Sequence, residues 1–343
     1  MRPRPPVIVI GAGRAGVGMA RGLKGAGYTV PAIVTRRASD AATASRWFGR
    51  GTGTTNLRGA VTRARIILIC VPDREIAGVV RQLVSLPAPL LRGRFVFHTS
   101  GVATGARLAR LRRRGASTGC VHPLVSFPPP GSEPCHLRGA AFAIDGDVRA
   151  LRAARTLVKS LGGVRIRVAP KDRPAYHLVA SLLANGLVAL IDDGFGLARR
   201  RLKMTDATVR AVFIPLLATV LANVARSGAR DALTGPVVRG DVETVGRLLQ
   251  QLRKEDPRLA DLYRLLARSA LRMARETERL DGPAAAEVER VGEEAATERG
   301  SGVRTASGST PTWRGCSSVG GARQPRTAQT GTKGREGPMA GSM

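Results

Sequence analysis

Three glycines with the spacing of a phosphate-binding turn, Gly11, Gly13 and Gly16, follow a short apolar run at residues 7–10. A stretch with helical periodicity comes next, and a second apolar run at residues 29–35 follows it. In this context the first glycine permits a sharp turn, the second leaves room for a pyrophosphate, and the third lets the helix pack closely on the sheet. We therefore expect a dinucleotide site at a helix N-terminus, and the alternative is an ordinary tight turn. The predicted phosphate-binding residues are Gly11, Gly13, Arg14, Ala15 and Gly16.

The end of the second apolar run indicates which dinucleotide binds. Chains that select NAD usually place an acid here, about 20 residues after the glycines, to bind the ribose 2′-hydroxyl. This chain has Thr35, Arg36 and Arg37 instead. Guanidinium groups suit a 2′-phosphate because they bind it bidentately. The sequence therefore predicts NADP(H), with these three residues around the 2′-phosphate; the alternative is that both arginines are ordinary surface residues.

Polar and small residues follow three further predicted strands. Ligands of open α/β sheets bind beyond the carboxyl ends of the strands, so the residues found there are candidates for a site. Val71 and Pro72 end one such strand and are expected to line the nicotinamide side of the cofactor site. His98 and Ser100 follow the next strand, and His122 ends a third. Ser100 is expected to hold a substrate carboxylate, whereas His98 either contacts a ligand or only fixes the strand end with a hydrogen bond.

The composition is strongly basic, with a formal net charge of +30. Nearly all basic residues are Arg, they are scattered along the chain, and the aromatic residues that would stack on bases make up only 3%. Enrichment in Arg, Ala and Gly together is typical of GC-rich coding. We therefore expect no specific nucleic-acid partner, although a chain of this charge binds polyanions nonspecifically in low salt.

The four cysteines form no CxxC pair and no disulfide framework, which is typical of a reducing cytoplasm. Cys120 and His122 with Cys135 and His136 offer metal-binding side chains, but their spacing matches no common zinc module, and we expect no metal site. No uninterrupted apolar run reaches the roughly 18 residues of a membrane-spanning helix, and no secretory signal precedes the first strand. The sequence predicts a cytoplasmic protein without membrane association.

Apolar strands alternate with helical stretches up to residue 169, and helical periodicity continues alone from residue 170. The sequence therefore predicts an α/β fold with a doubly wound Rossmann sheet over residues 1–169. An all-helical C-terminal domain for substrate binding and dimerisation is predicted over residues 170–281. Residues 282–343 are expected to form a disordered tail, because the chain beyond residue 300 contains no Leu, Ile or Phe.

Six motifs along residues 7–279 resemble one family. They are GAGRAG at 11–16, CVPD at 70–73, HTSG at 98–101, HPLVSF at 122–127, YHLVASLLANGLVAL at 176–190 and LTGPVVRGD at 233–241. In this combination the chain resembles the Rossmann-like NADP oxidoreductases with a C-terminal helical domain, which are related to ketopantoate reductases, pyrroline-5-carboxylate reductases and β-hydroxyacid dehydrogenases. The resemblance implies NAD(P) binding and a homodimer built through the helices. It implies no particular substrate, because most members have none assigned.

The resemblance also suggests residues for proton transfer. In the related β-hydroxyacid dehydrogenases a Lys and an Asn, four residues apart on a helix, face the nicotinamide. Asn185 matches that Asn, but Ser181 stands in the place of the Lys. His177 lies a further four residues back on the same predicted helical face, and an imidazole is a competent proton donor near neutral pH. We expect catalytic roles for His177 and Asn185; the alternative for His177 is a structural contact between domains.

Together these features predict an NADPH-dependent reductase that transfers hydride to a small 2-oxo or imino acid, with ketopantoate-like 2-oxo acids as the leading class. The expected substrate site lies between Ser100, His122, His177 and Asn185, with the proton supplied by His177, His98 or a held water. The alternative is a catalytically silent NADP-binding sensor or interaction protein, which the missing Lys favours.

Overall fold

The computed structural model describes residues 3–49, 52–132 and 137–297. The chain divides into two compact units, Met1–Thr219 and Val220–Met343. This division falls inside helix α9 (Asp206–Ala232), whereas the sequence predicts a change of domain at residue 170. Residue 170 is instead where the sheet gives way to helices, since the last strand that the described residues form ends at Ile166.

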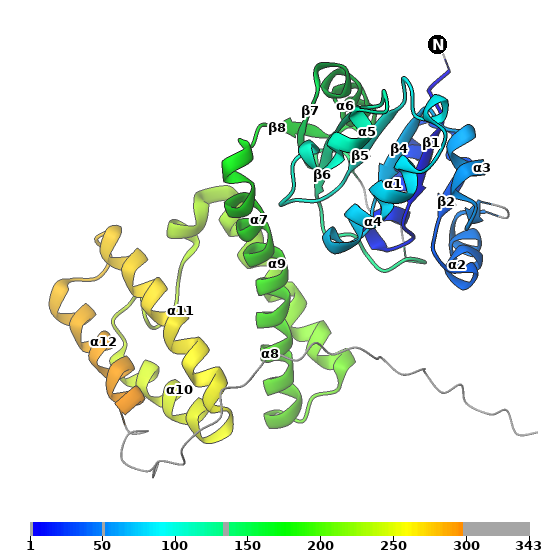
Figure 1. Cartoon of the computed structure of the whole chain (residues 1–343). Helices are drawn as coiled ribbons and strands as arrows, with labels where there is room; N and C mark the ends of the chain where they lie inside the picture. Colours follow the sequence, from blue (N-terminus) through cyan, green and yellow to red (C-terminus); the bar gives the residue numbers. More distant parts are fainter. Residues whose placement is uncertain (1–2, 50–51, 133–136, 298–343) are drawn as a thin grey trace, which may run out of the picture. The chain divides into compact units, whose positions relative to one another are not determined.

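The first unit contains an eight-stranded sheet in the order β3-β2-β1-β4-β5-β6-β7-β8 (Figure 1). The strands are β1 (Val7–Ile10), β2 (Ala32–Val34), β3 (Gly53–Thr54), β4 (Ile66–Ile69), β5 (Phe95–His98), β6 (Ser117–Leu124), β7 (Ala141–Gly146) and β8 (Val164–Ile166). Neighbours from β3 to β6 are parallel, β7 runs antiparallel to β6, and β8 is parallel to β7. The strand order reverses at β1, as in Rossmann sheets, and confirms the predicted fold class.

Helices connect most of the strands, and beyond β8 helices and helical turns are the only regular elements in the described part of the chain. Those of the first unit are α1 (Arg14–Gly25), α2 (Ala38–Phe48), α3 (Leu57–Thr62), α4 (Asp73–Val84), α5 (Ala109–Arg112), α6 (Val148–Ser160), α7 (Arg173–Ser181) and α8 (Leu187–Arg201). Short 3-10 turns occur at η1 (Ala88–Leu90), η2 (Gly105–Leu108) and η3 (Pro170–Asp172), and a π-helical turn, η4 (Leu182–Gly186), joins α7 to α8. The second unit contains α10 (Val242–Glu255), α11 (Pro257–Glu276) and α12 (Gly282–Thr297).

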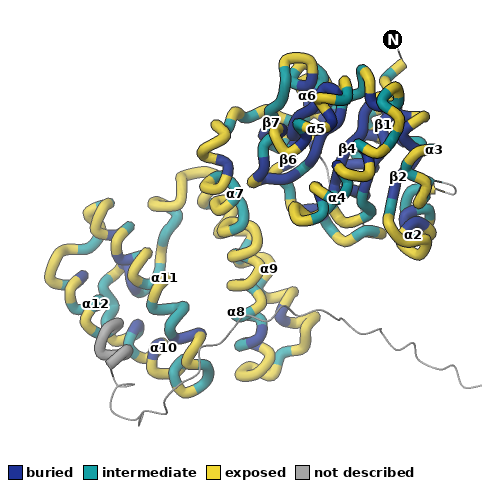
Figure 2. Tube along the Cα trace, in the orientation of Figure 1, coloured by how far each residue is buried: buried dark blue, intermediate teal, exposed yellow. Residues whose placement is uncertain are grey.

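Strands β1, β2 and β4 are buried on both faces, which explains why they read as continuous apolar runs. Successive residues of a strand point to opposite faces of the sheet. Val7 and Val9 of β1 therefore join one core cluster with α1 and α6, whereas Ile8 and Ile10 join a second cluster with α4 and α5. Figure 2 shows the burial concentrated in the central strands. The two clusters fix the carboxyl ends of the strands at one edge of the sheet.

Two features of the sheet differ from the sequence prediction. The two-residue strand β3 was not expected, because Gly53 and Thr54 carry no apolar signal. Strand β6 is longer than predicted: its parallel pairing with β5 stops at Cys120, but antiparallel pairing with β7 continues to Leu124. His122 therefore lies inside β6 and beyond the end of β5, rather than at the end of its own strand.

The expectation of a disordered tail from residue 282 is wrong for residues 282–297, which form helix α12. Ala285 and Val288 of α12 are buried in one core cluster with Val245 of α10 and Leu271 of α11. Their spacing of three residues is a helical signal that precedes the polar stretch on which the expectation rested. The remaining tail, residues 298–343, lies outside the described residues.

Removing α12 should destabilise the second unit. A chain that ends at Asp281 leaves Val245 and Leu271 without their partners Ala285 and Val288, whereas a chain that ends at Thr297 keeps the whole cluster. Burial of a few apolar side chains is worth several kcal/mol, and about 1 kcal/mol shifts the melting temperature of such a unit by a few degrees. We expect the shorter chain to melt at least about 5 °C below the longer one in calorimetry. Equal melting temperatures would show that α12 contributes nothing.

Candidate functional site

The glycine turn between β1 and α1 has the geometry that a bound phosphate requires. Gly11 adopts a φ of +110°, and a Cβ there would lie 2.3 Å from the carbonyl oxygen of Cys70. A Cβ on Gly16 would lie 2.0 Å from the carbonyl oxygen of Gly11, so the helix packs against the turn as expected. A Cβ on Gly13 would meet nothing within 4 Å, and no side chain caps the helix there. The turn thus leaves open space at an uncapped helix N-terminus, which fits a pyrophosphate.

A cavity of about 490 Å³, which we call the glycine-turn cavity, opens beside this turn. Its lining includes six predicted cofactor-binding residues: Gly11, Gly13, Thr35, Arg36, Val71 and Pro72. Four others do not line it: Arg14, Ala15 and Gly16 in the first turn of α1, and Arg37, which is the N-cap of α2. The cavity lies at the carboxyl ends of β1, β2 and β4, where the strand order reverses and where α/β sheets bind ligands.

Arg36 forms an ion pair that the sequence did not predict. Its Nη1 atom lies 3.0 Å from Oε2 of Glu75, which is in the first turn of α4 and also lines the glycine-turn cavity. The second oxygen of Glu75 lies 3.8 Å from Nε of Arg74. No local pattern relates Arg36 to Glu75, because the contact joins the ends of two strands that are not neighbours in sequence.

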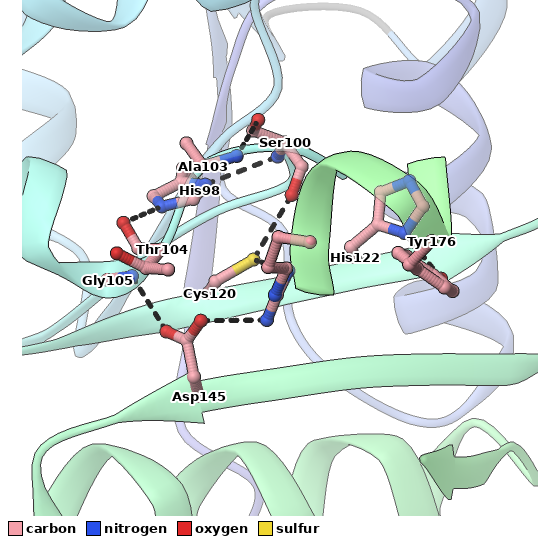
Figure 3. Close-up of polar contacts among 10 residues, drawn as sticks. His98, Ser100, Ala103, Thr104, Gly105, Cys120, His122, Asp145 and Tyr176 are labelled. Carbon is pink, nitrogen blue, oxygen red and sulfur yellow. Dashed lines mark hydrogen bonds and ion pairs between the residues drawn. The ribbon is translucent and has the colours of Figure 1, made fainter. Parts of the chain in front are cut away.

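The motif at 98–101 forms a tight polar turn (Figure 3). His98 is fully buried; its Nδ1 accepts a hydrogen bond from the backbone N–H of Ser100, and its Nε2 lies 2.9 Å from the carbonyl oxygen of Thr104. The Nε2 atom therefore carries the proton and donates to that carbonyl. Burial lowers the pKa of His98, which keeps the ring neutral. This geometry favours the alternative in which His98 fixes the strand end.

The hydroxyl of Ser100 is engaged within the protein. It donates to Oδ2 of Asp73 at 2.9 Å and accepts from the backbone N–H of Ala103 at 2.9 Å. Asp73 directly follows Pro72, which lines the glycine-turn cavity, and it begins helix α4. Ser100, which precedes Gly101 in the chain, is therefore bonded to the residue that follows the lining of the glycine-turn cavity. The expected contact between this hydroxyl and a substrate carboxylate stays a prediction.

A buried ion pair fixes the start of α7. Arg173 is fully buried, and its Nη2 atom donates to Oδ2 of Asp145 at 2.7 Å. The other oxygen of Asp145 accepts from the backbone N–H of Gly105 at 2.7 Å. Nη1 of Arg173 donates to Sγ of Cys120, which in turn donates to the carbonyl oxygen of Ser100. Burial raises the pKa of the Cys120 thiol to about 12, so the thiol keeps its proton.

The next residues of α7 bring two rings against His122. Nδ1 of His122 lies 2.9 Å from the hydroxyl of Tyr176, and the ring centroid of His177 lies 5.8 Å from that of His122. A Cβ on Gly101 would lie 2.3 Å from Nδ1 of His177 and 2.9 Å from Nε2 of His122. Both imidazoles therefore face the backbone of Gly101, where only a glycine fits. Tyr176 was not a predicted site residue, although it precedes His177 in the quoted motif.

Burial keeps His122 and Tyr176 neutral at pH 7. Burial, followed by the charges of His177 and Arg173, lowers the pKa of His122 to about 4. Burial raises the pKa of Tyr176, so the phenol also keeps its proton. Nδ1 of His177 is buried and has no hydrogen-bond partner within the described part of the chain. This nitrogen faces the backbone of Gly101.

The two rings open onto a second cavity, of about 400 Å³, which we call the α7 cavity. Its lining includes His122, His177, Ser181 and Asn185, so the four-residue steps along α7 and η4 do face one space, as expected. The amide of Asn185 is exposed and donates to the hydroxyl of Ser181 at 3.3 Å. The rest of the lining is mainly apolar: Pro123, Leu124, Val125, Ser126, Tyr176, Val179, Ala180, Leu183 and Ala184.

The described residues contain no group of three or more His, Cys, Asp or Glu side chains that could hold a metal ion. Cys135 and His136, which the sequence offered as metal-binding candidates, lie outside the described residues.

Two helical segments carry large exposed apolar surfaces. Pro170–Arg201 and Asp206–Ala232 are long and apolar enough to cross a membrane by length and composition, with 0% and 6% of their most apolar stretches buried. Leu178, Leu182 and Val188 are each more than half exposed. One or two such helices are weak evidence for a membrane, because the core helix of a soluble protein passes the same test of length and composition. The expected absence of membrane association and the cytoplasmic location stay predictions.

Two family models match separate parts of the chain, and the gap between the two matches falls between β6 and β7 of the sheet. Residues 1–123 match the family model of a Rossmann-like domain, and residues 140–270 match that of a domain of unknown function, DUF2520. No curated protein matches the chain at a significant level.

Several solved structures are similar. A candidate NADP oxidoreductase from Bacteroides fragilis is 20% identical with a TM-score of 0.62, covering 78% of this chain and 97% of that one. A protein from Thermotoga maritima is 23% identical with a TM-score of 0.57, covering 80% and 100%. An imine reductase from Pseudomonas sp. is 20% identical with a TM-score of 0.55, covering 84% and 99%. At these identities the similarity shows that the fold is shared.

The depressed pKa of His122 predicts an acid-sensitive fold. A histidine has a pKa near 6.5 in the unfolded chain and about 4 at this position. Between these values the unfolded chain binds the additional proton, so stability falls as the pH is lowered from about 6.5 to 4. His122→Gln cannot titrate, and its free energy of unfolding, measured with urea, should fall less between pH 7 and pH 5 than that of the wild type. An equal fall in both proteins would contradict the shift.

Proposed function

We propose that this chain, which belongs to the proteins that join a Rossmann-like domain to the domain of unknown function DUF2520, is an NADPH-dependent reductase. The observation that carries the proposal is the glycine turn, which leaves open space at Gly13. Arg36 lines the same glycine-turn cavity. Gly11 and Gly13, with the N-terminus of α1, would hold the pyrophosphate, and Arg36 with Thr35 would hold the 2′-phosphate. NADPH, when bound, supplies the hydride. Two structures of similar fold, a candidate NADP oxidoreductase and an imine reductase, support this assignment.

A chain of contacts links the proposed cofactor site to the proposed substrate site. Pro72 lines the glycine-turn cavity, Asp73 binds Ser100, and Gly101 touches both His122 and His177 at the α7 cavity. The substrate would therefore lie in the α7 cavity, at the same edge of the sheet as the nicotinamide. There the lining is mainly apolar, and His177 would donate the proton to the oxygen or nitrogen that develops charge.

The α7 cavity favours a neutral or imine substrate. The described residues that line it include no Lys or Arg, and His122 is neutral at pH 7. A carboxylate would be costly to bury there without a cation. We therefore place imines and ketones without a carboxylate first, and the 2-oxo and imino acids expected from the sequence, including ketopantoate-like acids, second.

The catalytically silent NADP-binding protein remains a distinct candidate because Ser181 stands where the related dehydrogenases have a Lys. NADPH oxidation against a panel of ketones, cyclic imines and 2-oxo acids separates the two functions. Oxidation with any member above the substrate-free rate supports the reductase. Tight NADPH binding without oxidation across the panel would favour the silent protein.

We also propose that the exposed apolar faces of α7, α8 and α9 pair with a second copy of the chain. A homodimer would cover Leu182 and Val188, which are 67% and 64% exposed. In light scattering the wild type should have twice the 36.1 kDa mass of one chain, and Leu182→Asp with Val188→Asp should yield monomer. Leu265→Asp, at a site 58% exposed on α11, is the matched control and should remain dimeric. A monomeric wild type, or one that partitions into membranes, would refute this pairing.

Turnover by variants of α7 tests the proton donor. His177→Gln keeps a polar side chain but cannot donate a proton, so kcat should fall by about 10² or more while KM changes little. Asn185→Ala should lower kcat by a similar factor of about 10² if its amide orients the substrate. Tyr176→Phe removes the hydroxyl beside His122 and tests whether the Tyr176 and His122 pair donates the proton instead. Full turnover by His177→Gln with an unchanged pH profile, together with a loss in Tyr176→Phe, would assign the proton to the Tyr176 and His122 pair.

A further inference from the structure

We infer that Glu75 sets the cofactor preference of the glycine-turn cavity, by competing with the 2′-phosphate of NADPH for Arg36 and by offering an acceptor to the ribose 2′-hydroxyl of NADH. The inference rests on the proposed function, because it concerns how the same site discriminates between two nicotinamide cofactors. It predicts a protein that binds both cofactors and prefers NADPH less strongly than its arginines suggest.

The position of Glu75 carries the inference. NAD-binding sheets place a carboxylate at the end of the second strand, and this chain has Thr35, Arg36 and Arg37 there. The fold brings a carboxylate to the same place from another element: Oε2 of Glu75, on α4, lies 3.0 Å from Nη1 of Arg36. Both side chains line the glycine-turn cavity, at the end where Thr35 also lies. The carboxylate that is missing from β2 is thus supplied by α4.

The two roles of Arg36 exclude one another in part. The Nη1 atom that faces Glu75 is one of the donors that would bind a 2′-phosphate in bidentate fashion. A phosphate on the remaining donors would lie within a few ångströms of the carboxylate, and like charges at that distance repel even when partly screened. The Arg36 side chain is 71% exposed and that of Glu75 is 33% exposed, so the pair can open without unpacking the core. A 2′-hydroxyl carries no charge and can donate to the same carboxylate.

The test is calorimetric titration of the full-length protein with NADPH and with NADH. Glu75→Gln keeps the shape of the side chain and removes its charge. We expect the ratio of NADPH to NADH affinity to rise by about three- to tenfold in this variant, and by less at high salt. Arg36→Ala should move the ratio in the opposite direction by weakening NADPH.

Two controls separate this effect from a general change of charge. Asp206→Asn removes a carboxylate that pairs with Arg199 of α8 and does not line the glycine-turn cavity. Glu243→Gln removes a carboxylate that pairs with Arg247 on α10. Neither should raise the ratio. The inference would be overturned if Glu75→Gln left the ratio of NADPH to NADH affinity unchanged or lowered it, or if both controls raised it equally. In either case NADPH binding would still support the reductase. A wild type that binds neither cofactor would overturn both proposals.

Discussion

The ion pair between Arg173 and Asp145 is the interaction on which the proposed substrate site depends. A fully buried guanidinium is costly unless a carboxylate and further hydrogen bonds satisfy it, and removal of one partner of such a pair typically costs about 3–5 kcal/mol. Asp145 is available because β7 runs antiparallel to β6 and places it opposite Cys120. Arg173 is the first residue of α7. The pair therefore sets where the helix starts and, one turn later, where His177 lies.

The same antiparallel strand determines the position of His122. Parallel pairing with β5 ends at Cys120, and only the pairing with β7 extends β6 far enough to carry His122 beyond its neighbour. Gly101 then accepts both imidazoles, since any side chain there would occupy the space of the two rings. The sheet topology therefore determines where α7 begins, and the start of α7 determines where the two rings lie. The glycine and the aromatic residues of the motifs occupy the positions that these constraints require.

The sequence allowed the prediction of elements that local patterns determine. Apolar runs such as residues 7–10 and 66–69 are strands because both of their faces are buried. The glycine spacing predicted the turn because each glycine satisfies a separate steric requirement. The partners that topology brings together could not be predicted in this way. Glu75 reaches Arg36, and Asp145 reaches Arg173, from elements far along the chain. Helix α12 was missed for a different reason, because Ala285 and Val288, the apolar side chains that its described part buries, are few beside its polar residues.

Charge is distributed unequally between the two cavities, and this difference determines which ligands and which reaction each cavity suits. Arg36 and Glu75 place full charges at the glycine-turn cavity, where a phosphorylated cofactor would be held in a partly open, screened setting. At the α7 cavity, burial keeps His122 neutral, and the fully buried guanidinium of Arg173 forms an ion pair with Asp145 instead of binding a ligand. A substrate atom that gained a proton there would take it from His177 or from the Tyr176 and His122 pair. This arrangement suits the reduction of a carbonyl or imine carbon, in which charge develops on one atom and is removed by one proton.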